Sequence, residues 1–164
     1  MNVSTLTRRS GAALLGTAPI VFALCLSSPQ AAAESTACPA PGTSATSVAL
    51  EGAQCSATST GGAAAAYGLD GNAAAEAGPT SLSLAIAQGG GRATSEASTL
   101  SGPAAIAIGP GATVSAAGVR PGLSIGIAGP GANVIITGDT TPTCSGGFGF
   151  AGDFQTLQGC LSLR

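Results

Sequence analysis

Hydrophobic and polar positions divide the chain into two kinds of segment. Residues 11–24 form one long apolar run that follows two arginines. From residue 59 to residue 138, large and small apolar residues alternate over short stretches, each bounded by Gly, Pro, Ser or Asn. Alternation with a period of two between turn residues is typical of β-strands. The pattern therefore predicts short strands and tight turns here, since Gly and Pro recur too often for helices.

The middle of the chain repeats with a period of 20 residues. Four blocks between residues 59 and 138 align without a gap, and the tetrapeptide GPGA occurs in both of the last two. Pro at the second position of a turn presets φ, and the Gly after it accepts positive φ. We therefore predict structural turns at the glycine that all four blocks share in their thirteenth position, namely Gly71, Gly91, Gly111 and Gly131.

Two architectures fit a strand–turn–strand–turn unit of this length. In a β-solenoid or β-roll, each block forms one coil and equal positions stack. In an up-and-down meander or small barrel, neighbouring strands form hairpins and need no stacking. The glycines in register and the small side chains favour the solenoid, because a narrow coil has no space for aromatic rings. The predicted fold class is all-β, with the meander or barrel as the alternative.

Gapless stacking places Glu76 and Glu96 at the same position of neighbouring coils, about 4.8 Å apart. Ala116 and Ile136 would continue this column. Two carboxylates supply too few oxygen ligands for a calcium ion. We therefore expect solvated surface carboxylates and no metal site.

Four cysteines flank the repeat, one pair on each side: Cys38, Cys55, Cys144 and Cys160. An even number of cysteines in an exported chain indicates disulfides. Pairing within each pair is the simplest arrangement and closes short loops, each worth roughly 3 kcal/mol of stability in the chain-entropy model. Pairing that ties the two ends together is the alternative. A zinc or redox site is not expected, because the C-x-x-C spacing is missing.

The segments outside the repeat have separate roles. Residues 1–33 have a positive start, an apolar run and the cleavage-site pattern Ala-Ala-Ala, which predicts a signal peptide. An uncleaved membrane anchor is the alternative, and both Sec and twin-arginine export remain open. Residues 34–58 are expected to be a Cys-stapled segment, a loop with one short strand at residues 47–50. Residues 139–164 are expected to form a Cys-stapled aromatic cap, or else an exposed aromatic patch.

Charge and composition exclude several classes of function. Beyond residue 33 the chain carries three arginines and seven carboxylates, so it lacks the basic footprint of a nucleic-acid or anionic-lipid binder. A second apolar run long enough to span a membrane is missing. The chain contains neither His nor Lys, which excludes a Ser-His-Asp triad and a Schiff-base lysine. The carboxylates that remain lack the aromatic context of a glycosidase: Asp70, Glu76, Glu96, Asp139 and Asp153. We therefore expect no catalytic residue, no cofactor and no enzyme.

Residues 105–114, AIAIGPGATV, are similar to the head repeats of trimeric autotransporter adhesins, which read A-x-A-x-G-x-x-A and form a β-roll. The similarity covers residues 104–138 but departs in period, and the stalk and membrane anchor of those adhesins are missing. The whole chain resembles small exported Ala/Gly-rich proteins of unknown function from high-GC Gram-positive bacteria. That resemblance implies an extracytoplasmic location, secreted or in the cell envelope, and carries over no site residues.

These observations predict a non-enzymatic structural or interaction module. Its partner would be an unidentified protein or cell-surface component, not nucleic acid and, after signal cleavage, not a membrane. The oligomeric state is left open. An adhesin-like or glycan-binding β-solenoid is the alternative function. An ice-binding solenoid would present a Thr-x-Thr ladder, whereas the repeat columns hold Ala, Ile and Ser.

Overall fold

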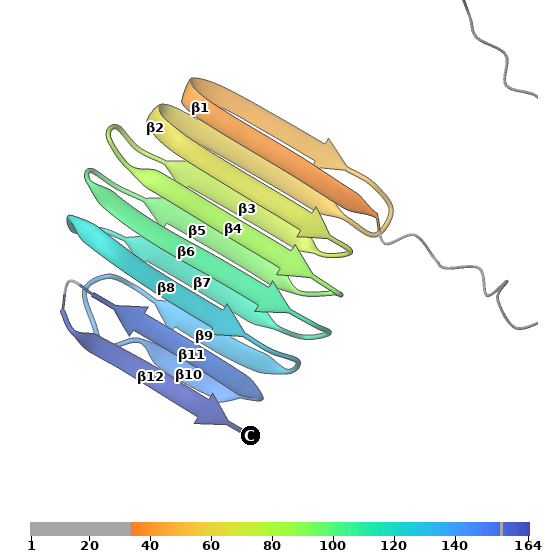
Figure 1. Ribbon diagram of the computed structural model, residues 1–164, viewed down its shortest axis with the longest axis vertical. Coiled ribbons are helices and arrows are strands. Elements are labelled where there is room, and N and C mark those ends of the chain that lie inside the picture. The colour runs from red at the N-terminus through yellow and green to blue at the C-terminus, as the bar shows by residue number, and fades with distance from the viewer. Residues whose placement is uncertain (1–33, 155) are drawn as a thin grey trace, which may run out of the picture. The chain divides into compact units, whose positions relative to one another are not determined.

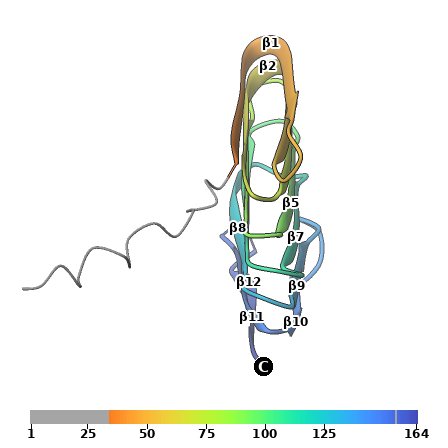
Figure 2. The ribbon, with the colours of Figure 1, turned by 90° about the vertical axis from the view of Figure 1, so that its right-hand side faces the viewer.

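The computed structural model describes residues 34–154 and 156–164, which form a β-solenoid of about four coils without any helix (Figure 1). The chain winds between two flat layers, seen edge-on in Figure 2. The long strand β2 (Gln54–Leu69) runs through both layers. The first layer continues with β4 (Leu82–Gln88), β6 (Ser101–Ile108) and β8 (Gly122–Ala128). The second continues with β3 (Asn72–Ala77), β5 (Arg92–Ala97), β7 (Thr113–Gly118) and β9 (Ala132–Ile136).

Neighbouring coils pair in parallel, which confirms the solenoid and rules out hairpins within the repeat. The register departs from the gapless alignment at one place. Asn72 pairs with Arg92, a step of 20 residues, but Arg92 pairs with Thr113, a step of 21. Glu76 and Glu96 are indeed neighbours, yet the next residue in their column is Ala117. The prediction that Ala116 continues this column is therefore wrong by one residue.

The extra residue is accommodated at the corner between the layers. The amide of Asn72 donates to the Gly91 carbonyl at 3.0 Å, whereas the amide of Arg92 donates to the Ala112 carbonyl at 2.9 Å. The buried corner position therefore passes from glycine to alanine, and the four predicted glycines do not stack in one line. Gly111 and Gly131 lie one position earlier, are exposed, and have φ of 71° and 68°. Those values are left-handed and favour glycine.

Gly71 and Gly91 stand at the same corner for a different reason. They are buried, and their φ values are not positive. A Cβ on Gly91 would lie 2.6 Å from the Ala107 carbonyl oxygen, and one on Gly71 would lie 2.9 Å from the Ala87 carbonyl carbon. Close approach of the backbones therefore requires glycine at these two positions.

Antiparallel strands close both ends of the solenoid. The N-terminal strand β1 (Ser35–Ala49) pairs along the whole of β2, so the expected loop at residues 34–58 is wrong. Full pairing is possible because β1 and β2 bend together at Gly42, where φ is 64°. The predicted boundary at 58/59 falls inside β2. At the other end, the closing strands are β10 (Thr143–Gly146) on β9, β11 (Phe148–Asp153) on β8, and β12 (Gln158–Leu163) on β11.

Each disulfide joins one layer to the other at an end of the stack. Cys38 in β1 pairs with Cys55 in β2, and Cys144 in β10 pairs with Cys160 in β12, which confirms pairing within each pair. The joined Cα atoms are 5.8 and 5.6 Å apart. Ordinary packed sheets lie about 10 Å apart. The two layers therefore lie unusually close together at both ends.

The narrow gap explains the composition of the interior. Nearly all buried apolar side chains are alanines, and Val114, Val134 and Ile136 are the only larger aliphatic ones among the described residues. Hydroxyl groups reach directly across the gap: Ser83 donates to the Ser95 carbonyl at 2.8 Å, and Ser95 donates to the Pro103 carbonyl at 3.0 Å. The valines face glycine, since a Cβ on Gly126 would lie 2.8 Å from Val114 Cγ1.

Candidate binding surface

The large apolar side chains of the first layer point outward, not into the core. Along β4 and β6 the inward positions are alanine or another small residue, and the outward positions are mostly leucine or isoleucine. The usual reading of such alternation puts the large residue inside. Here the gap between the layers admits only small residues, so the large ones lie on the surface. We call this surface the apolar face.

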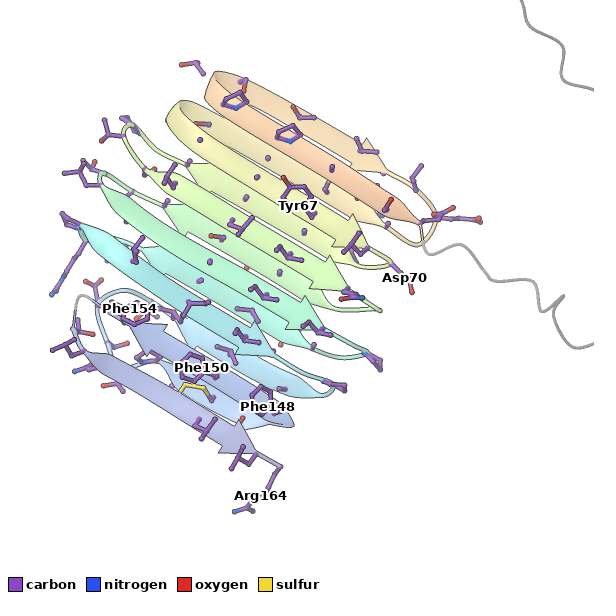
Figure 3. The ribbon with its side chains drawn as sticks, viewed as in Figure 1. Tyr67, Asp70, Phe148, Phe150, Phe154 and Arg164 are labelled. Atoms are coloured by element: carbon purple, nitrogen blue, oxygen red, sulfur yellow. A yellow bond between two sulfur atoms is a disulfide. The ribbon has the colours of Figure 1, made fainter. Side chains whose placement is uncertain are left out.

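The apolar face extends over β2, β4, β6, β8, β11 and β12. Its largest side chains are Tyr67, Leu69, Leu82, Leu84, Ile86, Ile106, Ile108, Leu123, Ile125, Ile127, Phe148, Phe150, Phe154, Leu161 and Leu163. Tyr67, Phe148 and Phe150 are seen from this side in Figure 3. Several are well exposed: 63% of Leu82, 62% of Leu123 and 60% of Leu161.

A continuous ridge crosses the apolar face along the solenoid axis. The paired positions are Tyr67, Ile86, Ile106, Ile127, Phe150 and Leu161, one from each successive strand. Cross-strand neighbours of this kind are close enough for their side chains to touch. The ridge is therefore one ordered row of large apolar groups, with Ile106 near its middle.

A shallow hollow of about 280 Å³ lies beside the ridge. Its floor is formed by small residues, including Ala65, Gly102 and Ala104, and Leu82 and Leu123 stand at its sides. Farther along, the rings of Phe150 and Phe154 flank Gly152, where a Cβ would lie 3.6 and 3.8 Å from them. The apolar face therefore has relief on the scale of a side chain.

Among the described outward residues of these strands, none carries a charge. The charged residues nearest to the face, Asp70 and Arg164, lie at its margins (Figure 3). Gln88 and the Tyr67 hydroxyl are the polar groups on it. Monomeric soluble proteins seldom expose a contiguous apolar surface of more than roughly 300–600 Å². A face built this way is typical of a surface that another molecule covers.

The second layer presents the opposite chemistry on what we call the polar face. Its outward positions include Gln54, Asn72, Arg92, Thr113 and Asn133, which follow one another from coil to coil. The Thr113 hydroxyl donates to Asn133 Oδ1 at 2.9 Å. An open groove of about 420 Å³ runs beside the first three of these residues. Amide, guanidinium and hydroxyl groups in a row can hydrogen-bond a polar ligand.

The carboxylates considered for catalysis are dispersed. Glu76 and Glu96 are exposed neighbours on the polar face, Asp70 lies at a corner, and Asp139 forms a surface salt bridge with Arg120 at 3.3 Å. Asp153 is buried and accepts a hydrogen bond from the Thr156 hydroxyl at 2.9 Å. In the described part of the chain, His, Cys, Asp and Glu form no group of three that could hold a metal ion. No helix there is long and apolar enough to cross a bilayer.

Sequence reasoning placed the disulfides and turns but missed the apolar face. The signal was present in the alternation itself. Alanines at 85, 87, 105 and 107 alternate with Leu84, Ile86, Ile106 and Ile108. A strand whose small positions are all alanine cannot supply a thick core, so its large positions had to face outward. The paired cysteines also favour an extracytoplasmic environment, because disulfides persist where it is oxidising.

Comparison with known proteins yields one match. The model of DUF6764, a family of unknown function, matches residues 3–163. Neither a curated protein nor a solved structure matches the chain significantly. The likeness to adhesin head repeats therefore stays a prediction.

Proposed function

The chain belongs to the DUF6764 family of unknown function, and we propose that this protein is a non-enzymatic, extracytoplasmic interaction module that binds through its apolar face. The observation that carries the proposal is the uncharged outer surface of the first layer, with Ile106 near its middle. Its apolar side chains cannot serve the core, because the core is on the other side of the sheet.

The geometry of the face supports a binding role over a purely structural one. Four side-chain columns run across six strands, and strand spacings then give a footprint of roughly 800 Å². That is the area one partner contributes to a standard protein–protein interface, about 800 Å². The stacked parallel strands and the two disulfides hold the face rigid, so little ordering is required on binding.

An extracytoplasmic, non-enzymatic role agrees with the remaining features. The signal peptide predicted for residues 1–33 lies outside the described residues and belongs to the proposal. So does the location, secreted or within the cell envelope. On the described surface, the exposed carboxylates Glu76 and Glu96 border an open hollow without aromatic neighbours. This is not the enclosed, mostly apolar cleft in which enzymes bind small substrates.

Site-specific photo-crosslinking in cells that make the protein tests the role of the face. A photoreactive residue replaces Ile106 on the apolar face or, as the matched control, Ser115 on the polar face of the same coil. We expect covalent adducts from position 106 in the extracytoplasmic fraction, and few from position 115. Equal labelling at both positions, or none at 106, would refute binding through the apolar face.

The polar groove supports a second candidate, a glycan- or surface-binding solenoid. Gln54, Asn72 and Arg92 line it in register, which suits a repeating polar ligand. Retention of the protein on insoluble cell-wall polysaccharide, lost in Asn72→Ala and kept in Ile106→Lys, would favour this function. Retention that is lost only in Ile106→Lys would place binding on the apolar face instead.

A further inference from the structure

We propose that the occupant of the apolar face is the apolar face of a second copy, so that the protein is a face-to-face homodimer. This inference rests on the proposed binding role of the face and names its partner. In the dimer, four layers are stacked and the two polar faces are on the outside.

The area is sufficient for a stable dimer. Two footprints of roughly 800 Å² bury about 1,600 Å² together, the size of a standard specific interface. Crystal-like incidental contacts are mostly under about 800 Å² in total. The ridge residue Ile106 would lie near the centre of this area, where hot spots concentrate.

The chemistry of the face restricts the partner to an apolar, flat surface. Backbone groups of β4, β6 and β8 are already engaged in the ladders with neighbouring strands, so they have no hydrogen bonds to offer a ligand. The described outward side chains include no charge, which a polar partner would require for orientation. Flat sheets with apolar outer faces pack on one another at about 10 Å. Another copy of this chain carries such a sheet.

The relief of the face is self-complementary. The ridge through Ile86, Ile106 and Ile127 runs beside the hollow over Gly102 and Ala104. A two-fold axis in the interface plane, parallel to the ridge and midway between ridge and hollow, brings the ridge of each copy opposite the hollow of the other. Isologous contacts of this kind close on themselves and give a dimer instead of a filament.

Charge does not oppose the pairing. Arg92, Glu76 and Glu96 are on the polar faces, which point away from the interface. The separation between the two polar faces exceeds the Debye length of about 8 Å in physiological salt. An anionic membrane is a poorer partner, because basic residues near the face are limited, among the described residues, to Arg120 and Arg164.

Sedimentation equilibrium of the full-length chain, expressed in an exporting host and purified with its disulfides intact, tests the dimer. Ile106→Lys buries a charge in the middle of the interface, and we expect the dimer dissociation constant to rise roughly 30-fold or more. Ile135→Lys is the matched control, since Ile135 is the exposed isoleucine of the polar face. Circular dichroism and melting temperature establish that both variants fold.

The expected result is a dimer for the wild type and for Ile135→Lys, and a monomer for Ile106→Lys. A wild-type monomer at 100 micromolar, or a dimer that both substitutions weaken equally, would overturn the inference. Monomers that sediment with neutral phosphatidylcholine vesicles through Ile106 would also overturn it. If the wild type is monomeric but position 106 still crosslinks to another molecule in cells, the binding role stands and only the second copy is wrong.

Discussion

Enlarging one inward alanine should cost far more than enlarging its neighbour. Ala116 in β7 is 2% exposed, and its column neighbours are Ser95 and Ile136, both also buried. Ala116→Leu inserts three further carbons between layers whose Cα atoms are 5.8 and 5.6 Å apart at the two disulfides. Because the disulfides tie the layers at both ends, the gap cannot simply widen.

The magnitude follows from the cost of overpacking, which is typically 1–3 kcal/mol. We expect about 3 kcal/mol for Ala116→Leu, at the upper end, since the backbone has little room to move. At this chain length each kcal/mol lowers the melting temperature by roughly 3–4 °C, so the variant should melt about 10 °C below the wild type. Ala117→Leu adds the same carbons on the outer side of the same strand and should change stability by less than about 0.5 kcal/mol.

Thermal and guanidinium unfolding followed by circular dichroism, without reductant, measures both variants. The comparison between adjacent positions cancels effects of strand propensity and leaves the interior packing. If Ala116→Leu and Ala117→Leu unfold together, or if Ala116→Leu is the more stable, then the layers can separate and the narrow core is not what restricts the interior to small residues.

Three further outcomes are expected. Mass spectrometry of non-reduced digests should find two disulfides and no free thiol in residues 34–164, and a free Cys144 would contradict the stapled ends. Gly126→Val should destabilise the fold by about 1–3 kcal/mol because its Cβ meets Val114, and adding Val114→Ala should restore part of the loss; additive effects would mean that the two residues do not touch. Ser95→Ala removes a hydroxyl that bridges the layers and should cost about 1–2 kcal/mol by chemical denaturation, whereas no change would make that bridge irrelevant.

Local signals were sufficient for the turns and the pairing of strands into coils. Pro-Gly at the corners and alternation between them depend on φ preferences and side-chain period, which act within a few residues. The exact register was out of reach. Where Gly91 is followed in the column by Ala112 and not Gly111, the corner takes up one extra residue at almost no local cost. Only hydrogen bonding to the adjacent coil determines which residue faces inward.

The segment before the repeat shows the same limit. Its Ser, Thr, Ala and Pro content indicated a loop, since none of these signals a buried strand. Next to the free edge of β2, however, unpaired backbone groups would be exposed, and pairing with β1 satisfies them. Proximity to an edge therefore decided the conformation of residues 35–49, a factor that composition does not carry.

By itself, the sequence determined an all-β solenoid with narrow coils, its glycine turns and its cysteine pairs, because each depends on small side chains and local backbone geometry. The tertiary structure decided which side of each strand is the inside. With only alanine-sized space between the layers, the larger residues from Tyr67 to Leu163 are forced outward, and the surface that we propose for binding exists because the core has no room for them.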